Sequence, residues 1–308
     1  DDTMSFYNVS DPNNPVYINT TPLLCSANST LYKDNKLCVN GNRWGYSIYD
    51  VSDVANPQLL YETVLANGAY FGGIVDNYFI TTDMMERYYE IKTIDISDPA
   101  NPIVVARWNP GIQYYGVLFF NAGENTALIS IEGFWALVDM QNPLSFQMIN
   151  QGTASSSIGY MKKYNQILYT CLTNISKLGI YDLSVVPAVL HSEIDLGDMP
   201  LWLDIKDEFM YISIQSGIDV YSIRDPLNPG YVTSYSTPNQ NMMIHIVDDN
   251  LYIAETDRLE IVNIANPTIP EFVSYLLIPD LKGPYGLKTM GVEGQFAYCS
   301  GNLSLIHI

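Results

Sequence analysis

Positively charged side chains are scarce in this chain of 308 residues. Lys and Arg together number 14 against 33 Asp and Glu, so the formal net charge is −19 at pH 7. A surface of this sign repels phosphate backbones and anionic lipid head groups. We therefore exclude nucleic acid as a partner and expect the acidic side chains to form mainly a solvated surface.

Histidine is also rare, and the sequence patterns that usually carry catalysis are missing. The chain has 3 His, and it contains no nucleophile elbow, phosphate-binding loop, paired zinc histidines or EF-hand loop. Most metal and acid–base mechanisms therefore lack the side chains they need. We expect no cofactor, with calcium at Asx-rich turns as the alternative.

Long hydrophobic runs and helical periodicity are absent as well. The longest apolar stretches, such as residues 114–120, have the length of a strand and not the ~18 residues of a membrane-spanning helix. Hydrophobic residues nevertheless make up 47% of the chain and aromatics 12%, with 24 Tyr. These residue types suit pleated, half-buried strands, so we expect an all-β chain without a membrane span.

Cysteine is too sparse for a disulfide framework and is not spaced like a zinc or redox motif. The four are Cys25, Cys38, Cys171 and Cys299. Cys25 and Cys38 flank an expected hairpin, and in an oxidising compartment they are the candidate disulfide. Buried free thiols are the alternative.

One phrase returns along the whole chain: an apolar strand that ends in a polar residue, followed by a turn rich in Asp, Asn and Pro. The keyed residue of this phrase recurs at Asn8, Asp50, Asp95, Asp139, Asp182, Ser222, Asn263 and His307. The seven intervals have nearly equal lengths, each about 40–45 residues, which is the period of a four-stranded propeller blade. We predict a seven-bladed β-propeller of four-stranded antiparallel blades, formed by residues 1–308 as a single domain.

Each unit divides into four strands, which we name A to D from the ring axis outward. In the second unit they are expected at 70–75, 78–82, 89–96 and 103–108, with a long B–C loop at 83–87. Asp76 and Asn77 tolerate the left-handed geometry of a tight A–B hairpin. Pro99 and Pro102 flank the C–D turn, where their fixed φ ends the strand.

Ring closure requires the two chain ends to share one blade. The last 24 residues, 285–308, are expected to supply strands A, B and C, and residues 16–20 the missing strand D. Residues 1–12 would then be a surplus copy of strand C or a lead-in segment. Such a copy lies outside the ring, displaces the C-terminal copy of strand C, or belongs to a longer protein from which the chain is cut.

The recurring phrase resembles the LVIVD repeat, and the resemblance covers nearly the whole chain. It is close at residues 91–102 and 218–229, and weaker in the fourth unit, where Ser184, Val185, Val186 and Pro187 replace the Asp-Pro turn. The resemblance implies a β-propeller of bacterial or archaeal surface or exported proteins, most of which have no assigned activity. It brings no catalytic residues to this chain.

Three charged residues fall in one expected register on successive innermost strands: Asp204, His245 and Lys288, with Met161 in the same register of the blade before them. An acid, an imidazole and an amine near the channel axis can bind a polar ligand or transfer protons. A buried network in which the three satisfy one another is the alternative, and we favour it.

A set of aromatic residues lies at the start of the expected A strands, where the D–A and B–C loops open onto one face. They are Tyr70, Phe71, Tyr115, Trp202 and Tyr285. Around a channel mouth such rings can stack on sugars or capture a flat or cationic group. Packing between blades is the alternative role.

Several weaker features point to export. Sequons for N-glycosylation occur at Asn8, Asn19, Asn28, Asn174 and Asn302. The chain begins at Asp1 and not at Met, as after processing or trimming of an upstream segment, for which a removed signal peptide is one explanation among several. We therefore expect an extracellular or cell-surface location. The favoured function is a binding or adhesion module that recognises a protein, a glycan or a small polar ligand at the channel mouth. The alternative is a channel-centred hydrolase or lyase that uses Asp204, His245 and Lys288.

Overall fold

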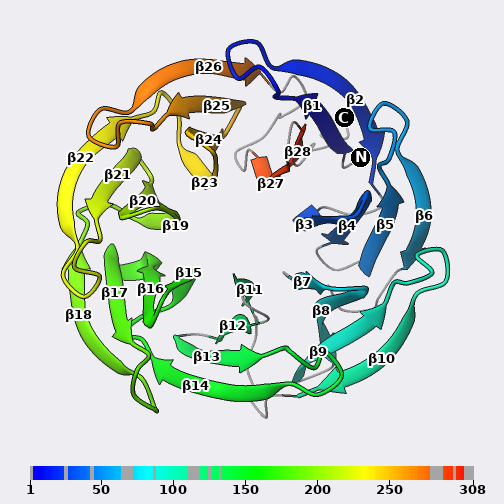
Figure 1. The fold of residues 1–308 in the computed structure, drawn as a ribbon, viewed down its shortest axis with the longest axis horizontal. Coiled ribbons are helices and arrows are strands. Elements are labelled where there is room, and N and C mark those ends of the chain that lie inside the picture. Colours follow the sequence, from blue (N-terminus) through cyan, green and yellow to red (C-terminus); the bar gives the residue numbers. More distant parts are fainter. Residues whose placement is uncertain are drawn as a thin grey trace, which may run out of the picture.

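The computed structural model describes residues 3–23, 27–41, 45–63, 72–85, 88–109, 118–123, 126–131, 133–277, 287–293 and 296–301. Seven four-stranded antiparallel sheets stand around a central axis like the blades of a propeller (Figure 1). Within these residues the one helical segment is a short 3-10 turn, η1 (Thr173–Ile175). The predicted seven-bladed propeller is therefore confirmed.

Six blades are built from strands that follow one another along the chain in the order A to D. Blade 1 has β3 (Ala27–Lys33), β4 (Lys36–Gly41), β5 (Gly45–Asp50) and β6 (Gln58–Thr63). Blade 2 has β7 (Gly72–Val75), β8 (Tyr78–Met85), β9 (Tyr88–Asp95) and β10 (Ile103–Trp108). Blade 3 has β11 (Leu118–Gly123), β12 (Thr126–Ile131), β13 (Phe134–Asp139) and β14 (Gln147–Thr153).

The second half of the ring continues in the same way. Blade 4 has β15 (Ile158–Tyr164), β16 (Ile167–Leu172), β17 (Lys177–Asp182) and β18 (Val189–Asp195). Blade 5 has β19 (Pro200–Lys206), β20 (Phe209–Ile214), β21 (Gly217–Ser222) and β22 (Gly230–Ser236). Blade 6 has β23 (Asn241–Val247), β24 (Asn250–Glu255), β25 (Arg258–Asn263) and β26 (Glu271–Leu277).

Blade 7 closes the ring and corrects the expected division of strands. It combines β27 (Leu287–Glu293) and β28 (Phe296–Gly301) with β1 (Thr3–Asn8) and β2 (Val16–Pro22), in the order β27-β28-β1-β2. Strand C therefore comes from the N-terminal segment and not from the C-terminal one, because β1 pairs with β28 along its whole length. Residues 3–8 are an integral strand, so of the alternatives for the N-terminal copy the one in which it takes the place of strand C in blade 7 is correct.

The hydrophobic core lies between the blades. Residues that alternate along a strand face opposite neighbours, because successive side chains of a strand point to opposite faces of the sheet. In β20, Met210 and Ile212 pack toward blade 4, whereas Tyr211 packs with Leu251 and Ile253 of blade 6. Each blade is thus held by two neighbours, and the innermost strands of successive blades contact one another around the ring.

The A–B and C–D turns share one face of the ring, which we call the turn face. Asp76, Asp207 and Asp248 open A–B turns with φ of 51°, 53° and 52°, as predicted from their tolerance of left-handed geometry. In blade 2 the N–H of Ile96, which follows strand C, donates to the carbonyl of Asn77 in the A–B turn at 2.8 Å. The B–C and D–A loops must lie on the opposite face, which we call the loop face.

The recurrent Asp residues serve the turns. Asp95 accepts a hydrogen bond from the N–H of Ser97 at 2.9 Å, which lowers the pKa of its carboxyl, and Asp98 accepts one from the N–H of Ala100 at 3.2 Å. The second oxygen of Asp98 accepts a bond from the side-chain amide of Asn101 at 2.9 Å. Two successive Asx turns thus explain why the phrase repeats with Asp or Asn at fixed positions.

Blade 4 lacks the Asp-Pro turn, and a side chain of blade 3 forms hydrogen bonds with the turn found in its place. Asn150 of β14 is 3% exposed, and its amide nitrogen donates to the carbonyls of Leu183 and Val185 at 3.2 and 2.8 Å. Its oxygen accepts the N–H of Ala188 at 2.8 Å. Asp182 accepts the N–H of Ser184 at 2.8 Å, and a side chain of the neighbouring blade holds the rest of the turn.

Blade 2 differs from the expectation in its B–C connection. β8 continues to Met85 and β9 begins at Tyr88, with Asp83 paired to Glu90 and Met84 paired to Tyr89. The expected long loop at 83–87 is therefore wrong, because the strand-forming residues Tyr88 and Tyr89 extend the hairpin over its polar part.

Candidate functional site

Asp204, in the middle of β19, is the centre of a charged group at the ring axis. One of its oxygens accepts the N–H of Ile205 at 2.9 Å, and the other accepts the N–H of Ile246 in the neighbouring β23 at 3.0 Å. The residue is 7% exposed. A carboxylate that receives two backbone N–H groups has a fixed position, so Asp204 joins blades 5 and 6.

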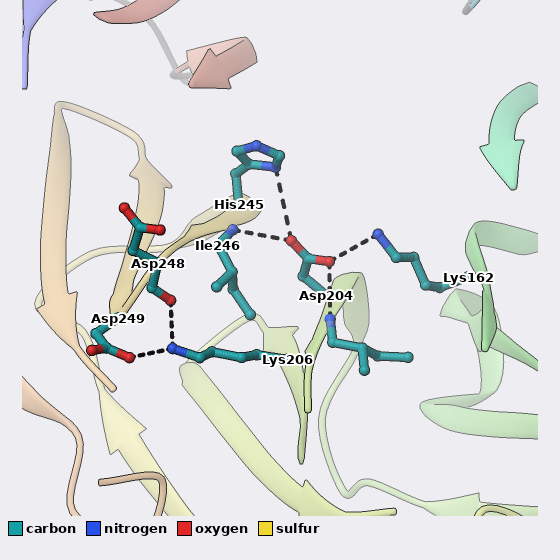
Figure 2. A pocket seen from close by; sticks show the side chains of 8 residues that line it. Lys162, Asp204, Lys206, His245, Ile246, Asp248 and Asp249 are labelled. Carbon is teal, nitrogen blue, oxygen red and sulfur yellow. Dashed lines mark hydrogen bonds and ion pairs between the residues drawn. The ribbon is translucent and has the colours of Figure 1, made fainter. Parts of the chain in front are cut away.

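Two basic side chains approach Asp204 from either side (Figure 2). Lys162 of β15 forms an ion pair with it at 2.9 Å, and Nδ1 of His245 in β23 lies 3.8 Å from its second oxygen. Lys162 and His245 are about a third and nearly half exposed, whereas Asp204 is buried. Asp204 is therefore paired with Lys162 and lies close to His245, and both basic side chains remain partly exposed.

A second cluster lies next to this one at the turn face. Nζ of Lys206, the last residue of β19, donates to the carbonyl of Asp248 at 2.6 Å and to the carboxylate of Asp249. Asp248 and Asp249 form the A–B turn of blade 6, so this contact also crosses between blades.

Together the two clusters line a pocket of about 590 Å³ that we call the turn-face pocket. Its lining residues are Lys162, Asp204, Ile205, Lys206, His245, Ile246, Asp248 and Asp249. They come from the innermost strands of blades 4, 5 and 6 and from one A–B turn (Figure 2). The volume is that of a small-molecule site, and the lining offers both hydrogen-bond donors and acceptors.

The register expected from the sequence was correct for Asp204 and His245 and wrong for Met161 and Lys288. Asp204 pairs with Tyr211 and His245 with Tyr252, and the corresponding pairs are Lys162 with Tyr169 and Gly291 with Tyr298. Lys162, not Met161, is therefore the equivalent residue of blade 4. Lys288 lies three residues before the register position, because β27 extends to Glu293 before its turn.

The missed lysine was recognisable from turn chemistry. Asn165 has φ of 53° and opens the A–B turn of blade 4, as Asp207 does in blade 5. Counting three residues back from each of these residues gives Lys162 and Asp204. Centring the alignment on the first left-handed residue therefore places the ion pair.

Of the five aromatic residues expected at the channel mouth, the structure describes Trp202. Its ring stacks on Tyr160 of the neighbouring blade, with centroids 3.8 Å apart and an angle of 26° between the planes. It also contacts the hydrophobic clusters on both sides of blade 5. Trp202 thus packs between blades. Tyr70, Phe71, Tyr115 and Tyr285 lie outside the described residues.

The cysteines and sequons occupy varied surroundings. Cys38, Cys171 and Cys299 are buried free thiols, and burial raises the pKa of Cys38 to about 12. Cys38 is thus not bridged in this structure, and its expected partner Cys25 lies outside the described residues. Asn174 is exposed in η1, Asn8 and Asn19 are half-buried, Asn28 lies in β3, and Asn302 is not among the described residues.

Comparisons with known proteins identify the fold and no family. No family model matches the chain, and no curated protein matches it. A protein of unknown function from Desulfotomaculum acetoxidans has a TM-score of 0.69 at 11% identity, with 89% of this chain and 95% of that chain covered. A protein from Lactobacillus plantarum has a TM-score of 0.69 at 8% identity, over 90% and 97% of the two chains. A computationally designed protein has a TM-score of 0.65 at 10% identity, over 92% and 84%.

The described residues contain neither a cluster of metal-ligating side chains nor a membrane-spanning helix. No group of three or more His, Cys, Asp or Glu side chains in this part of the chain is placed to hold a metal ion. No helix among these residues has the length and hydrophobicity needed to cross a membrane.

Proposed function

We propose that this chain is a binding module that holds a small polar ligand, such as the terminal sugar of a glycan, in the turn-face pocket. The observation that carries the proposal is the pocket itself, in which Asp204 fixes Lys162 and His245 beside the Lys206–Asp249 pair. Inter-blade bonds place these side chains before any ligand arrives. Preorganised donors and acceptors reduce the entropic cost of binding.

The pocket is lined by both basic and acidic side chains, which favours a hydroxylated ligand. Lysine and histidine N–H groups donate, and the carboxylates of Asp248 and Asp249 accept, at separate points of one cavity. A hydroxylated ligand satisfies both kinds of group, whereas a simple anion meets repulsion from the carboxylates. A neutral sugar fits best, since each of its hydroxyl groups can both donate and accept a hydrogen bond.

The hydrolase or lyase alternative has less support. Both oxygens of Asp204 accept backbone N–H groups, which hold the carboxylate in place as a structural acceptor. Lys288 does not share the register of Asp204 and His245, so the expected catalytic group loses its amine. We therefore retain binding as the function.

Binding to an array of neutral and acidic glycans, followed by affinity measurements on the best ligand, tests the proposal. Lys162→Ala and His245→Ala should each weaken binding at least ~10-fold, the loss of one good polar contact. Lys163→Ala is the matched control, because Lys163 precedes the same turn and does not line the pocket. Equal affinity of all three variants, or turnover of the ligand that His245→Ala abolishes, would contradict a binding pocket.

Trp202→Ala separates the turn-face pocket from the loop-face mouth. Trp202 packs between blades, so its removal should lower the melting temperature while the folded protein still binds the ligand. Loss of binding by a fully folded Trp202→Ala protein would instead favour the aromatic mouth.

We further propose that the protein works outside the cytoplasm, at the cell surface or as a secreted protein. The sequons, of which Asn174 is exposed, and the resemblance to the LVIVD repeat support this location. Intact mass of the native protein and a thiol count under denaturing conditions test it. Four free thiols on an unmodified chain would remove the internal support.

A further inference from the structure

A second polar site is buried between blades 5 and 6, near the loop face and away from the turn-face pocket. Glu255 ends β24 with 0% exposure, and Glu260 lies in β25 with 2% exposure. Both face blade 5, since Glu255 continues the alternation of Leu251 and Ile253, and Glu260 that of Val262. Two carboxyl groups thus share one interface with almost no contact with solvent.

Neighbouring residues donate hydrogen bonds to some, but not all, of the carboxyl oxygens of Glu255 and Glu260. Tyr235 of blade 5 donates its hydroxyl to Glu260 at 2.6 Å, and the N–H of Asn239 donates to one oxygen of Glu255 at 3.1 Å. The other oxygen of Glu255 receives no donor from the described part of the chain. The carboxyl groups of Glu255 and Glu260 also lie within hydrogen-bonding distance of each other.

Two more unpartnered oxygens belong to residues that border this interface. Asn241, directly paired with Glu255, is 0% exposed and donates its amide to the carbonyls of Ile214 and Gly217 at 3.2 and 2.8 Å, while its oxygen has no described partner. The buried hydroxyl of Ser213, which continues the alternation of Tyr211 toward blade 6, is also unpartnered among the described residues. One proton shared by the carboxyl pair cannot satisfy three separate oxygens.

The excess of negative charge at this interface indicates that the absent ligand is a cation. Arg258, beside Glu255 and Glu260, forms an ion pair with Asp257 at 3.0 Å and lies over the ring of Tyr275 at 4.7 Å. Asp257, whose side chain is about half exposed, pairs with this guanidinium, so the two buried carboxyl groups carry two negative charges when both are ionised. Unpaired buried charge is strongly unfavourable, and oxygen ligands of carboxylate, amide and hydroxyl type suit a hard divalent cation.

We propose that the interface of blades 5 and 6 binds one hard divalent cation of the calcium type through oxygens of Glu255, Glu260, Asn241 and Ser213. The site needs only two carboxylates, because neutral oxygens supply the other ligands. Its role is to lock β24 and β25 against β20, independently of any ligand in the turn-face pocket.

Calcium binding by the whole chain tests the proposal. Protein stripped with EDTA at pH 8 is titrated with CaCl₂ by calorimetry and by thermal unfolding. We expect one saturable site and a rise in melting temperature of a few degrees. Glu255→Gln should weaken the binding at least ~10-fold, with Asn241→Leu as a second variant should Glu255→Gln not fold.

Asp219→Asn is the matched control. Asp219 is also a buried acid, 8% exposed, whose pKa is raised by burial and by Asp198, but it lies outside the group of four ligands. Its variant should bind calcium as the unaltered protein does. An absent calorimetric signal would mean that water alone fills the interface. Binding that persists in both Glu255→Gln and Asn241→Leu would place the ion elsewhere, for instance at the Asx turns, and either result overturns the proposal.

Discussion

At the scale of single residues, Asp204 combines two tasks that the sequence presents as alternatives. It ties together the innermost strands of blades 4, 5 and 6 through Lys162 and the N–H of Ile246, and it lies between the two basic side chains of the turn-face pocket. The buried network and the binding site are therefore one structure. The buried carboxylate of Asp204 connects the strands, while the partly exposed side chains of Lys162 and His245 are the groups that can contact a ligand.

Replacement of Asp204 should reveal this asymmetry. Asp204→Ala removes the acceptor of two backbone N–H groups and one ion pair, so the free energy of unfolding should fall by ~3 kcal/mol. Lys162→Met should cost less than half as much, because Lys162 is a third exposed and leaves both backbone bonds intact. Urea unfolding of the two variants measures the difference, and equal losses would show that Asp204 is not the anchor.

Glu255 predicts a specific dependence of stability on pH. Burial and Glu260 raise its pKa from 4.5 to about 7, so between these values the folded protein holds a proton that the unfolded chain has released. The free energy of unfolding should therefore fall as the pH rises through this window. In EDTA, Glu255→Gln should reduce the loss of stability between pH 5 and pH 8 by ~2 kcal/mol. Identical pH profiles of the two proteins would contradict this assignment.

At the scale of strands and turns, the fold was predictable because its signals are local. Asx residues and prolines mark each turn independently of distant contacts, so Asp95 and Asp98 could be assigned from their neighbours alone. The site was less predictable, because a shift of one residue moves a side chain to the other face of a strand. Met161 and Lys162 differ by that one position, and the left-handed residue Asn165 resolves it.

The hydrogen bonds of Asn150 to the turn of blade 4 could not be predicted from local sequence patterns. Its side chain caps the turn of blade 4 from blade 3, and its partners lie 33 to 38 residues further along the chain. Asn150→Ala should lower the free energy of unfolding by ~2 kcal/mol, because it removes three hydrogen bonds, one of them to the buried carbonyl of Leu183. Asn56→Ala, which removes one exposed bond to Asp53, is the control and should cost clearly less. Chemical denaturation compares them, and similar losses would contradict the inter-blade cap.

At the scale of the whole molecule, closure by two strands from each chain end could not be derived from the repeat. The phrase occurs eight times for seven blades, so two copies compete for one place in blade 7. The pairing of β1 with β28 decides between them, and Ser274 of blade 6 donates a hydrogen bond to the carbonyl of Pro12, which fixes the turn between β1 and β2. Such contacts between distant segments are not encoded in local residue patterns.

A single cysteine substitution tests this closure. Ser5 is paired directly with Cys299 across β1 and β28, and both are buried. Ser5→Cys should therefore form a disulfide with Cys299 on mild oxidation, because paired residues of neighbouring strands lie within disulfide distance. Peptide mapping without reduction identifies the link. Ser10→Cys, in the exposed turn after β1, should not form it, and failure of Ser5→Cys to form it would contradict the closure.

The function proposed for the protein depends on where the ligand binds. A crystal structure of the protein with the best ligand from the glycan array is the most direct measurement. It should place the ligand in the turn-face pocket, with a polar group in contact with Lys162 and His245 and with Asp204 unmoved. A ligand bound at the loop face beside Trp202, or on the outer strands of the blades, would contradict the assignment of this pocket as the functional site.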